Sequence, residues 1–360
     1  MLDENNHFLG LALQKAQLSE GQCAPNPAVG AVVVRNGEVV ACGFHRGPGL
    51  AHAEVEALSQ LSDAECAGGT LYVTLEPCCH HGRTPPCTEL IIKRGIKHVV
   101  YAFADPNPQV AGKGALQLRE AGVTCQHIST PAIDAFYQPY AHWWKTKTPW
   151  MIAKLAMSLD GKIAGHDGEP LAITGEKVRA FTHAWRGRCD AILTSVRTIK
   201  KDNPQFTVRA KNKIKYKPLV VVDSRLQLEM DARVFEGRPV DCPVICLHSD
   251  AASSSEQERL EGAGVRCIEV VSQQHGQLDL HAVVKSLGAL GYHRVWIESG
   301  GALFSAFLRE KLLQQAFIAV APKWLGLNAV PAFDDLTQLR DLPKATLEKL
   351  GQDALFEWNF

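Results

Sequence analysis

The sequence predicts a two-domain α/β protein, in which each domain is a layered sheet covered by helices. The chain has 360 residues, 46% of them apolar, which is enough to build two ordinary cores. Short β-branched runs alternate with segments of helical spacing along its whole length, a pattern typical of α/β layers. The composition changes near residues 141–149, where two tryptophans precede a Lys- and Thr-rich stretch that ends in Pro149. We therefore expect domains at residues 1–145 and 149–360.

In the expected first domain, helices and strands alternate from the start. Asn36 and Gly37 form a hairpin turn signal between two of the strands. The predicted strands cover residues 28–35, 38–43, 70–75, 99–104 and 123–127. The predicted helices cover residues 8–18, 53–61, 89–94 and 112–121. The strand at 70–75 is expected to deliver Cys78 to a helix N-terminus.

The expected second domain opens with a strand at residues 150–156. Further strands are predicted at residues 191–195, 219–223, 244–248, 265–271, 295–299 and 317–321. Helices are predicted at residues 176–185, 256–261, 280–290 and 303–310. A span of about 210 residues is a normal size for one domain.

Two segments of the first half contain the residues with the clearest chemical meaning. His52 stands in Ala-His-Ala-Glu-Val, and Cys78 and Cys87 stand in Glu-Pro-Cys-Cys-His-His-Gly-Arg-Thr-Pro-Pro-Cys. One imidazole and two thiolates fill three corners of a zinc tetrahedron, and an open fourth corner for water is typical of a catalytic site. The signature of zinc nucleobase deaminases pairs His-x-Glu with Pro-Cys-x-x-Cys, whereas here eight residues separate the two cysteines.

Glu54 is the expected proton shuttle of this site. Zinc lowers the pKa of its bound water toward ~7, and Glu54 would take the water proton and pass it to the ring nitrogen and the leaving ammonia. Because residues two apart do not share a helix face, His52 and Glu54 must lie at the first turn of a helix. Spacing alone leaves two alternatives open. His80 or His81 could replace His52, or the zinc could be structural with Cys79 or Cys66 as a fourth ligand.

Composition restricts the partners and the compartment. Lys plus Arg is 38 and Asp plus Glu is 38, so the chain is formally neutral and poorly suited to nucleic acid, and no such partner is expected. Eleven cysteines are too dilute for a disulfide scaffold and are typical of the reducing cytoplasm, where we expect the protein. The polar N-terminus is not a signal peptide, and no apolar run approaches 18 residues, so no membrane partner is expected.

The second half has a strand, a Gly-Gly turn and a helix start at residues 296–304. Backbone N–H groups at such a helix start bind phosphate, although a turn of this kind often binds nothing and lacks the six-residue dinucleotide fingerprint. Arg186 and Arg209 could clamp a phosphate with paired donors. The alternative is that both are solvated surface charges.

Taken together, these motifs resemble the bifunctional deaminase–reductases of riboflavin biosynthesis, from residue 25 to about residue 326. The first half carries Pro-Asn-Pro at 25–27, Gly-Phe-His at 43–45, His-Ala-Glu at 52–54, Thr-Leu-Glu-Pro-Cys at 74–78, the stretch 80–87 with its long cysteine spacing, and Asp-Pro-Asn-Pro-Gln-Val-Ala-Gly at 105–112. The second half carries Lys154, Ser-Leu-Asp-Gly at 158–161, Ile-Thr-Gly at 173–175, Asp-Asn-Pro at 202–204, Thr-Val-Arg at 207–209, Asp-Ser at 223–224 and Glu-Ser-Gly-Gly at 298–301.

The resemblance implies an N-terminal cytidine-deaminase-like three-layer α/β/α domain and a C-terminal dihydrofolate-reductase-like α/β domain. It implies Zn²⁺-dependent deamination of a diamino-hydroxy-pyrimidine bearing a phosphoribosylamino group, then reduction of its ribose by NADPH. The small phosphorylated pyrimidine is the implied partner, in a homo-oligomer that is a dimer or a tetramer. The implied NADPH contacts are Ala156, Ala172, Thr198, Asp202, Ser224, Gly300, Gly301, Ala302, Leu303, Phe304, Ser305 and Ala306. The implied substrate contacts are Lys154, Pro170, Arg186, Phe206, Arg209 and Glu298.

Two positions depart from the pattern of this family. It usually has a polar residue in place of Pro170 and a tryptophan in place of Ala172. Proline has no N–H to donate, and alanine cannot stack on a cofactor ring, so these positions leave room for a weakened reductase. Two other readings are an RNA-editing deaminase with a nucleic-acid-binding second half, and a second half that only promotes oligomerisation. The one basic run that would serve the former, residues 211–217, is expected to be a loop.

Overall fold

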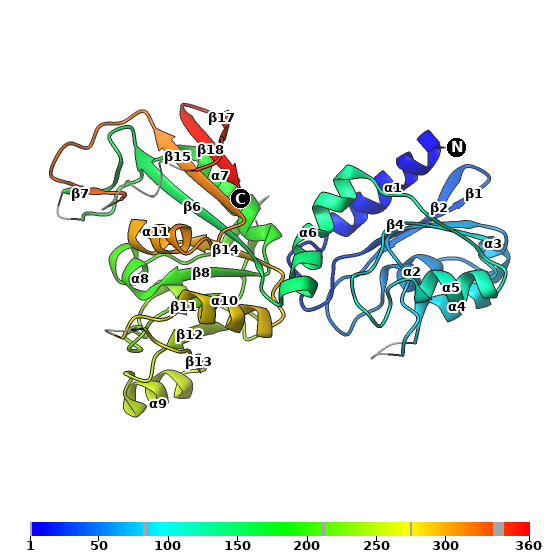
Figure 1. The fold of residues 1–360 in the computed structure, drawn as a ribbon, viewed down its shortest axis with the longest axis horizontal. Coiled ribbons are helices and arrows are strands. Elements are labelled where there is room, and N and C mark those ends of the chain that lie inside the picture. Colours follow the sequence, from blue (N-terminus) through cyan, green and yellow to red (C-terminus); the bar gives the residue numbers. More distant parts are fainter. Residues whose placement is uncertain (1, 82–84, 167, 211–212, 274–275, 334–341) are drawn as a thin grey trace. The chain divides into compact units, whose positions relative to one another are not determined.

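The computed structural model describes residues 2–81, 85–166, 168–210, 213–273, 276–333 and 342–360 (Figure 1). The chain divides into two compact units, Met1–Lys147 and Thr148–Phe360. Part of the expected zinc loop, residues 82–84, lies outside the described residues. The first two residues of the basic run at 211–217 also lie outside them.

The first unit is built on a five-stranded sheet in the order β2-β1-β3-β4-β5. Its strands are β1 (Gly30–Arg35), β2 (Glu38–Phe44), β3 (Thr70–Leu75), β4 (His98–Phe103) and β5 (Thr124–His127). β1 is antiparallel to β2 and β3, whereas β3, β4 and β5 are parallel. The β1–β2 turn has the positive φ angles that its sequence predicts, 52° at Asn36 and 79° at Gly37.

Helices cover both faces of this sheet, which confirms the expected three-layer α/β/α arrangement. Its helices are α1 (Leu2–Gln17), α2 (Ala53–Leu58), α3 (Asp63–Cys66), α4 (Cys87–Lys93), α5 (Lys113–Glu120) and α6 (Pro131–Thr146). Along β1, Val32 and Val34 pack with α1 and α6, and Ala31 and Val33 pack with α2, α4 and α5. The continuous apolar run of β1 is therefore explained by burial on both faces.

The second unit contains a nine-stranded sheet in the order β13-β12-β11-β8-β14-β6-β15-β18-β17. Its strands are β6 (Trp150–Ser158), β8 (Ala191–Ser195), β11 (Leu219–Val222), β12 (Val244–His248), β13 (Arg266–Glu269), β14 (Arg294–Glu298), β15 (Gln315–Ala321), β17 (Thr346–Leu350) and β18 (Asp353–Asn359). The strands from β13 to β15 are parallel, and β18 and β17 are antiparallel additions at one edge. Two short ribbons pair β7 (Lys162–His166) with β16 (Ala329–Pro331) and β9 (Val208–Ala210) with β10 (Lys213–Lys215).

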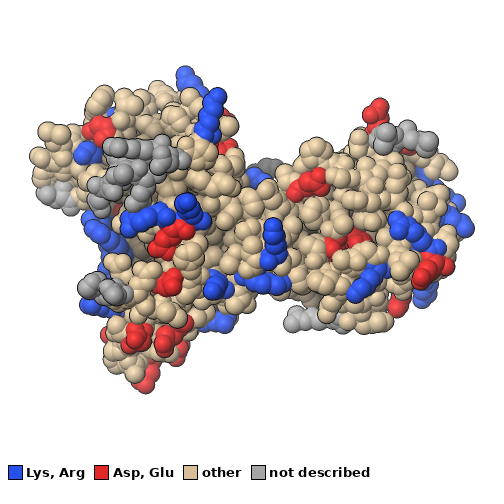
Figure 2. All heavy atoms as spheres, viewed as in Figure 1, with Lys and Arg blue, Asp and Glu red and all other residues tan. Residues whose placement is uncertain are grey.

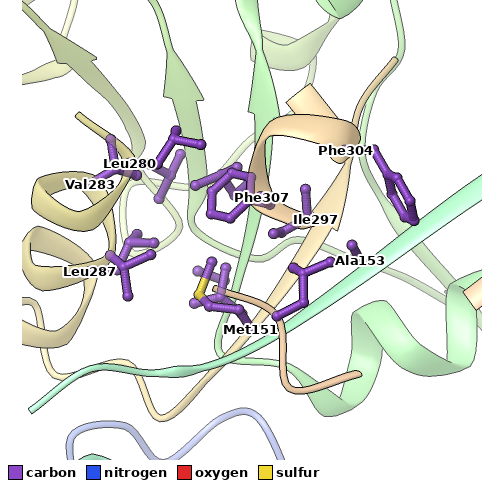
Figure 3. Packing of buried hydrophobic residues seen from close by; sticks show 14 of the residues in the cluster. Met151, Ala153, Leu280, Val283, Leu287, Ile297, Phe304 and Phe307 are labelled. Carbon is purple, nitrogen blue, oxygen red and sulfur yellow. The ribbon is translucent and has the colours of Figure 1, made fainter. Parts of the chain in front are cut away.

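Two apolar clusters fill the two faces of the large sheet. The helices are α7 (Glu176–Arg188), α8 (Val196–Asp202), α9 (Ser254–Gly262), α10 (Leu280–Ala289) and α11 (Gly301–Arg309), with a 3₁₀ turn η1 (Arg233–Phe235). Figure 3 shows one cluster, in which Leu287 of α10 and Phe307 of α11 pack against strand residues Met151 and Ile297. The opposite cluster contains Trp296 and residues of α7 and α9.

Several elements differ from those expected. α6 runs through residues 131–146 and so extends into the predicted boundary region at 141–149, because Thr130 caps it and Pro131 suits its first turn despite the internal Pro139. α8, β17 and β18 were not expected, and residues 213–215 of the basic run form a strand, β10, and not a loop.

None of the described helices combines the length and the apolar character needed to cross a membrane. On the face drawn in Figure 2, basic and acidic side chains are intermixed over each unit.

Candidate active sites

The first site forms where α2 begins. His52 is the N-cap residue of α2, with extended backbone angles, and Glu54 lies in the first turn, as the spacing predicted. α2 lies so close to β2 that a Cβ on Gly43 would be 2.4 Å from the carbonyl oxygen of Ala53. Glycine at this position therefore allows the helix start, and His52 with it, to lie against the sheet.

The structure brings His52, Cys78 and Cys87 together. Their candidate ligand atoms all lie within 4.8 Å of one another, with His52 Nδ1 3.2 Å from Cys87 Sγ and 3.5 Å from Cys78 Sγ. Among the described residues, no other His, Cys, Asp or Glu belongs to this group. One imidazole and two thiolates suit zinc, and three protein ligands leave a coordination position open, as in catalytic sites.

Cys78 lies in the loop after β3. This loop brings its sulfur to the N-terminus of α4, as expected. Cys87 is the first residue of α4, and its backbone N–H donates to Cys78 Sγ over 3.4 Å. Hydrogen bonds from the side chain of Cys87, from His52 and from the Cys87 backbone hold the pKa of the Cys78 thiol at about 4. The site therefore favours a thiolate before any metal is considered.

Glu54 is buried beside these ligands. Burial, and to a lesser degree the Cys78 thiolate, raises the pKa of the Glu54 carboxyl to about 7. A carboxyl with a pKa near neutrality can both accept and return a proton. His52, Glu54 and Cys78 line a cavity of about 420 Å³, which is large enough for a small ring compound.

The alternative ligands occupy other positions. His81 is exposed and lies 3.2 Å from Glu89 Oε1, and Cys66 Sγ accepts a hydrogen bond from Arg94. Cys79 is directed to the carbonyl oxygen of Gln109 at 3.7 Å. His80 lines the cavity without joining the ligand group. The geometry therefore favours His52 and an open site over the two alternatives.

His45 was not predicted as a site residue, although it lies in the Gly-Phe-His motif. Its Nδ1 is 3.0 Å from the carbonyl oxygen of Ala51, and its Nε2 is 3.2 Å from the amide nitrogen of Asn26. Burial lowers the pKa of His45, which favours the neutral ring. An amide N–H donor at Nε2 assigns the proton to Nδ1, so His45 donates to Ala51 and holds the residue that precedes His52.

Asp105 and Tyr140 also lie at the first cavity and were not predicted as site residues. The Tyr140 hydroxyl donates to Asp105 Oδ1 over 3.2 Å, and burial raises the pKa of Asp105 to about 6. The Asp-Pro-Asn-Pro motif was the only sequence signal for Asp105.

The second site is a cavity of about 490 Å³ at the carboxyl ends of β6, β8 and β14. Ligands of open α/β sheets bind in this position. The expected residues that line it are Lys154, Ala156, Ala172, Arg186, Thr198, Asp202, Phe206, Glu298, Gly300, Gly301, Ala302 and Leu303. The expected residues that do not line it are Pro170, Arg209, Ser224, Phe304, Ser305 and Ala306.

Arg186 and Glu298 form a paired contact within this cavity. Arg186 Nε donates to Glu298 Oε1 over 2.5 Å and Nη2 donates to Oε2 over 2.8 Å, while Nη1 donates to the carbonyl oxygen of Thr207. Burial alone would raise the pKa of Glu298, but the charge and hydrogen bonds of Arg186, together with Lys154 and Trp296, more than offset burial, so that pKa lies below its usual range. Burial lowers the pKa of the neighbouring Lys154, which pairs with Glu298 in the β6–β14 register.

Arg186 and Arg209 do not both line the cavity, so the expected phosphate clamp is not assembled there in this structure. Arg186 is committed to a carboxylate, and Arg209 donates to Gln205 Oε1 and Thr207 Oγ1 outside the cavity. Arg179, which was not predicted, lines the cavity on the same face of α7 as Arg186. Its spacing of seven residues from Arg186, two helical turns, was the available signal.

Close packing constrains the Gly-Gly turn. A Cβ on Gly301 would lie 1.7 Å from the carbonyl oxygen of Ala332, so packing within the protein already requires glycine there. A Cβ on Gly300 would meet no atom within 4 Å. Phe304 is buried in the core, as Figure 3 shows, because it lies one turn into α11 on the face toward the sheet.

Comparison with known proteins agrees with this architecture. Residues 149–356 match the model of the RibD C-terminal domain, and residues 2–103 match the zinc-binding region of cytidine and deoxycytidylate deaminases. The chain is 36% identical to the riboflavin biosynthesis protein RibD of Actinobacillus pleuropneumoniae over 98% of this chain and 94% of the relative. It is 32% identical to RibD of Escherichia coli K12, with 96% of each chain covered.

Solved structures show the same likeness. A structure of RibD from Acinetobacter baumannii has a TM-score of 0.87 and 32% identity, and covers 100% of this chain and 99% of its own. A deaminase/reductase from Thermotoga maritima has a TM-score of 0.83 and 31% identity, with 99% of both chains covered. The second half therefore has the fold of the RibD reductase domain, and none of these matches is a nucleic-acid-binding module. This chain belongs to the RibD family of bifunctional riboflavin biosynthesis proteins, with a deaminase domain followed by a reductase domain.

Proposed function

We propose that this chain deaminates 2,5-diamino-6-(5-phosphoribosylamino)pyrimidin-4-one by hydrolysis and then reduces the ribosyl group with NADPH. The product would be 5-amino-6-(5-phosphoribitylamino)uracil. Residues 1–145 would carry the first reaction and residues 149–360 the second. The observation that carries this proposal is the convergence of His52, Cys78 and Cys87 beside the buried Glu54 in a cavity.

In the deaminase, His52, Cys78 and Cys87 would hold zinc, which supplies the Lewis acidity that brings the pKa of water to about 7. Glu54 would accept the proton of the attacking water. It would then return protons to the ring nitrogen and to the departing amine, so that water and the ring C–NH₂ give C=O and ammonia. The raised pKa of Glu54 supports both halves of this role.

In the reductase, the first-turn N–H groups of α11 would bind the phosphates of NADPH, which supplies the hydride. Thr198 Oγ1, 3.4 Å from the Gly300 nitrogen, would hold the turn. Lys154 and Glu298 would hold the ribose hydroxyls, because both line the cavity and lie opposite each other in adjacent strands. Ala172 would offer only small apolar surface at the cavity.

The phosphate of the substrate requires a cation in the second cavity that is not already neutralised. Arg186 is paired with Glu298 and Arg209 lies outside the lining, which leaves Arg179, Arg197 and Lys201. We propose Arg179 for this contact, because it lies on the same face of α7 as Arg186. Arg179 is an exposed residue of α7 that lines the cavity, and a guanidinium can form paired hydrogen bonds with a phosphate.

One experiment tests the whole proposal. The protein is incubated with the phosphoribosylamino-pyrimidine, with and without NADPH, while ammonia and NADPH are followed separately. Ammonia should appear in both reactions, and NADPH should be consumed only after deamination. Ammonia without NADPH consumption would leave a deaminase with an inactive reductase half. The expected homo-oligomer and the cytoplasmic location stay predictions, and light scattering of the purified protein measures the former.

A further inference from the structure

Helix α5 carries none of the zinc ligands, yet it contacts the ligand loop next to both cysteines. Glu76, two residues before Cys78, is buried with 3% exposure. Its Oε2 accepts a hydrogen bond from the Gly112 N–H over 3.0 Å, and its Oε1 accepts one from the Ala115 N–H over 3.1 Å. Gly112 is the N-cap residue of α5, so Glu76 caps this helix from a distant part of the chain.

The second contact involves Thr88, the residue after the other cysteine ligand. Thr88 Oγ1 donates to Gln117 Oε1 of α5 over 2.8 Å, and the Thr88 N–H donates to the carbonyl oxygen of Cys78 over 3.2 Å. Gly114 permits this approach, because a Cβ there would lie 2.0 Å from the carbonyl oxygen of Pro77. The N-terminal turn of α5 therefore lies directly against the peptide that leads into Cys78.

Glu76 also lines the first cavity, where it could be mistaken for a second proton carrier. Both of its oxygens accept backbone N–H groups, whereas Glu54 is the carboxylate that lies with the ligands. Proton transfer through Glu76 would break the cap of α5. A role in holding the loop fits these contacts better than a role in chemistry.

We infer that Glu76 is a positioning residue and that Glu76 and Thr88 make α5 a clamp for the two thiolates. This rests on the proposed function in one respect, that His52, Cys78 and Cys87 hold zinc. The clamp fixes the separation of the thiolates before the metal arrives, so its loss should show first in zinc retention. Outer partners of metal ligands typically change metal affinity by about 10–100-fold.

The test is the rate at which zinc leaves the full-length protein for a chromophoric chelator in excess. Glu76→Gln keeps the side-chain shape but turns an amide N–H₂ toward backbone donors, so we expect zinc release at least ~10-fold faster than in the wild type. Glu65→Gln is the matched control. Glu65 also accepts a helix-capping hydrogen bond, from the Ser62 N–H over 2.7 Å, but on α3 and at the surface. Its release rate should equal that of the wild type.

A folded Glu76→Gln protein that releases zinc at the wild-type rate would overturn the inference. If that variant does not fold by circular dichroism, Thr88→Val decides. We expect about five-fold faster release from the loss of one neutral hydrogen bond, and an unchanged rate would count against the clamp. A wild-type protein that binds no stoichiometric zinc would instead refute the proposed deaminase site, which separates the two failures.

Discussion

Arg186 and Glu298 are 112 residues apart in sequence, and their side chains meet in two parallel hydrogen bonds within the second cavity. Their side chains are only 13% and 16% exposed. Trp296 Nε1 adds a third donor to Glu298 at 2.6 Å. The pair therefore joins α7 to β14 and leaves the carboxylate ionised. A buried charge that loses its partner destabilises the folded protein. The Arg186–Glu298 pair therefore stabilises the fold around the cavity in addition to lining it.

Replacing Glu298 with glutamine should destabilise the second unit strongly. The substitution leaves the Arg186 guanidinium buried and unpaired, and breaking a buried pair in this way costs about 3–5 kcal/mol. Urea unfolding followed by tryptophan fluorescence measures the change. Glu236→Gln is a suitable control, because Glu236 pairs with Arg233 at the surface and such pairs contribute little. If both variants lost the same free energy of unfolding, the buried pair would contribute no more to stability than the surface pair.

The same pair predicts a pH dependence. The pKa of Glu298 in the folded protein lies below its ordinary value of 4.5, so its stabilising contribution is complete above pH 4.5. That contribution is lost as the pH falls through the lowered pKa. Wild-type unfolding free energy should therefore drop more steeply below pH 4.5 than that of Glu298→Gln. Parallel curves for the two proteins would contradict this.

Glu54→Gln should keep zinc and lose deamination. The ligands are unchanged, but an amide cannot accept the water proton, and loss of a general acid–base catalyst costs about 10²–10⁴-fold in rate. Atomic absorption measures zinc, and ammonia release measures the reaction. NADPH oxidation with the deaminated pyrimidine is the internal control and should be unaffected. Turnover near the wild-type rate would remove Glu54 from the mechanism.

Cys87→Ser should reduce the zinc content of the purified protein. A hydroxyl is a far weaker zinc ligand than a thiolate, and since loss of an outer partner already costs about 10–100-fold, we expect an affinity loss of at least that size. Cys66→Ser is the control, because Cys66 is buried in the same unit but contacts Arg94. Full zinc occupancy in Cys87→Ser would place the metal elsewhere.

Arg179→Ala should raise the reductase KM for the phosphorylated substrate. Loss of a hydrogen bond to a charged group costs about 1.5–3 kcal/mol, or about 10–100-fold. Arg209→Ala is the comparison and should change KM less, because Arg209 does not line the cavity. A dephosphorylated substrate should show no difference between the wild type and Arg179→Ala. A raised KM for NADPH in place of the substrate would assign Arg179 to the cofactor phosphates.

The sequence predicted that His52, Cys78 and Cys87 come together, because each lies in a short motif whose residue types suit metal chemistry. The position of His52 and Glu54 at a helix start followed from their spacing, and the structure has it so. The capping of α5 by Glu76 could not be predicted. Its donors are the backbone N–H groups of Gly112 and Ala115, which lie 36 and 39 positions away in sequence and carry no side-chain signal. Sequence motifs show which groups react, and less clearly which groups hold them.

The second cavity shows the same limit. Lys154, Glu298 and Gly300 were placed by resemblance, and they line the cavity. The pairing of Arg186 with Glu298 was missed because two isolated charges far apart in a sequence do not reveal that they meet. α6 was not predicted because the composition change at residues 141–149 indicated a domain boundary, whereas Thr130 and Pro131 provide a good helix start. Packing outweighed the local signal in that case.

β18 has a consequence for the order in which the second unit is made. It pairs with β15 near one edge of the sheet, and Asp353 at its start accepts a hydrogen bond over 2.7 Å from the Gly175 N–H, at the N-cap of α7. The helix that contributes Arg179 and Arg186 is thus secured by a residue translated some 180 positions later. On the ribosome, the N-terminus of α7 gains this hydrogen bond only after that aspartate has emerged from the exit tunnel, whereas His52, Cys78 and Cys87 have all emerged long before.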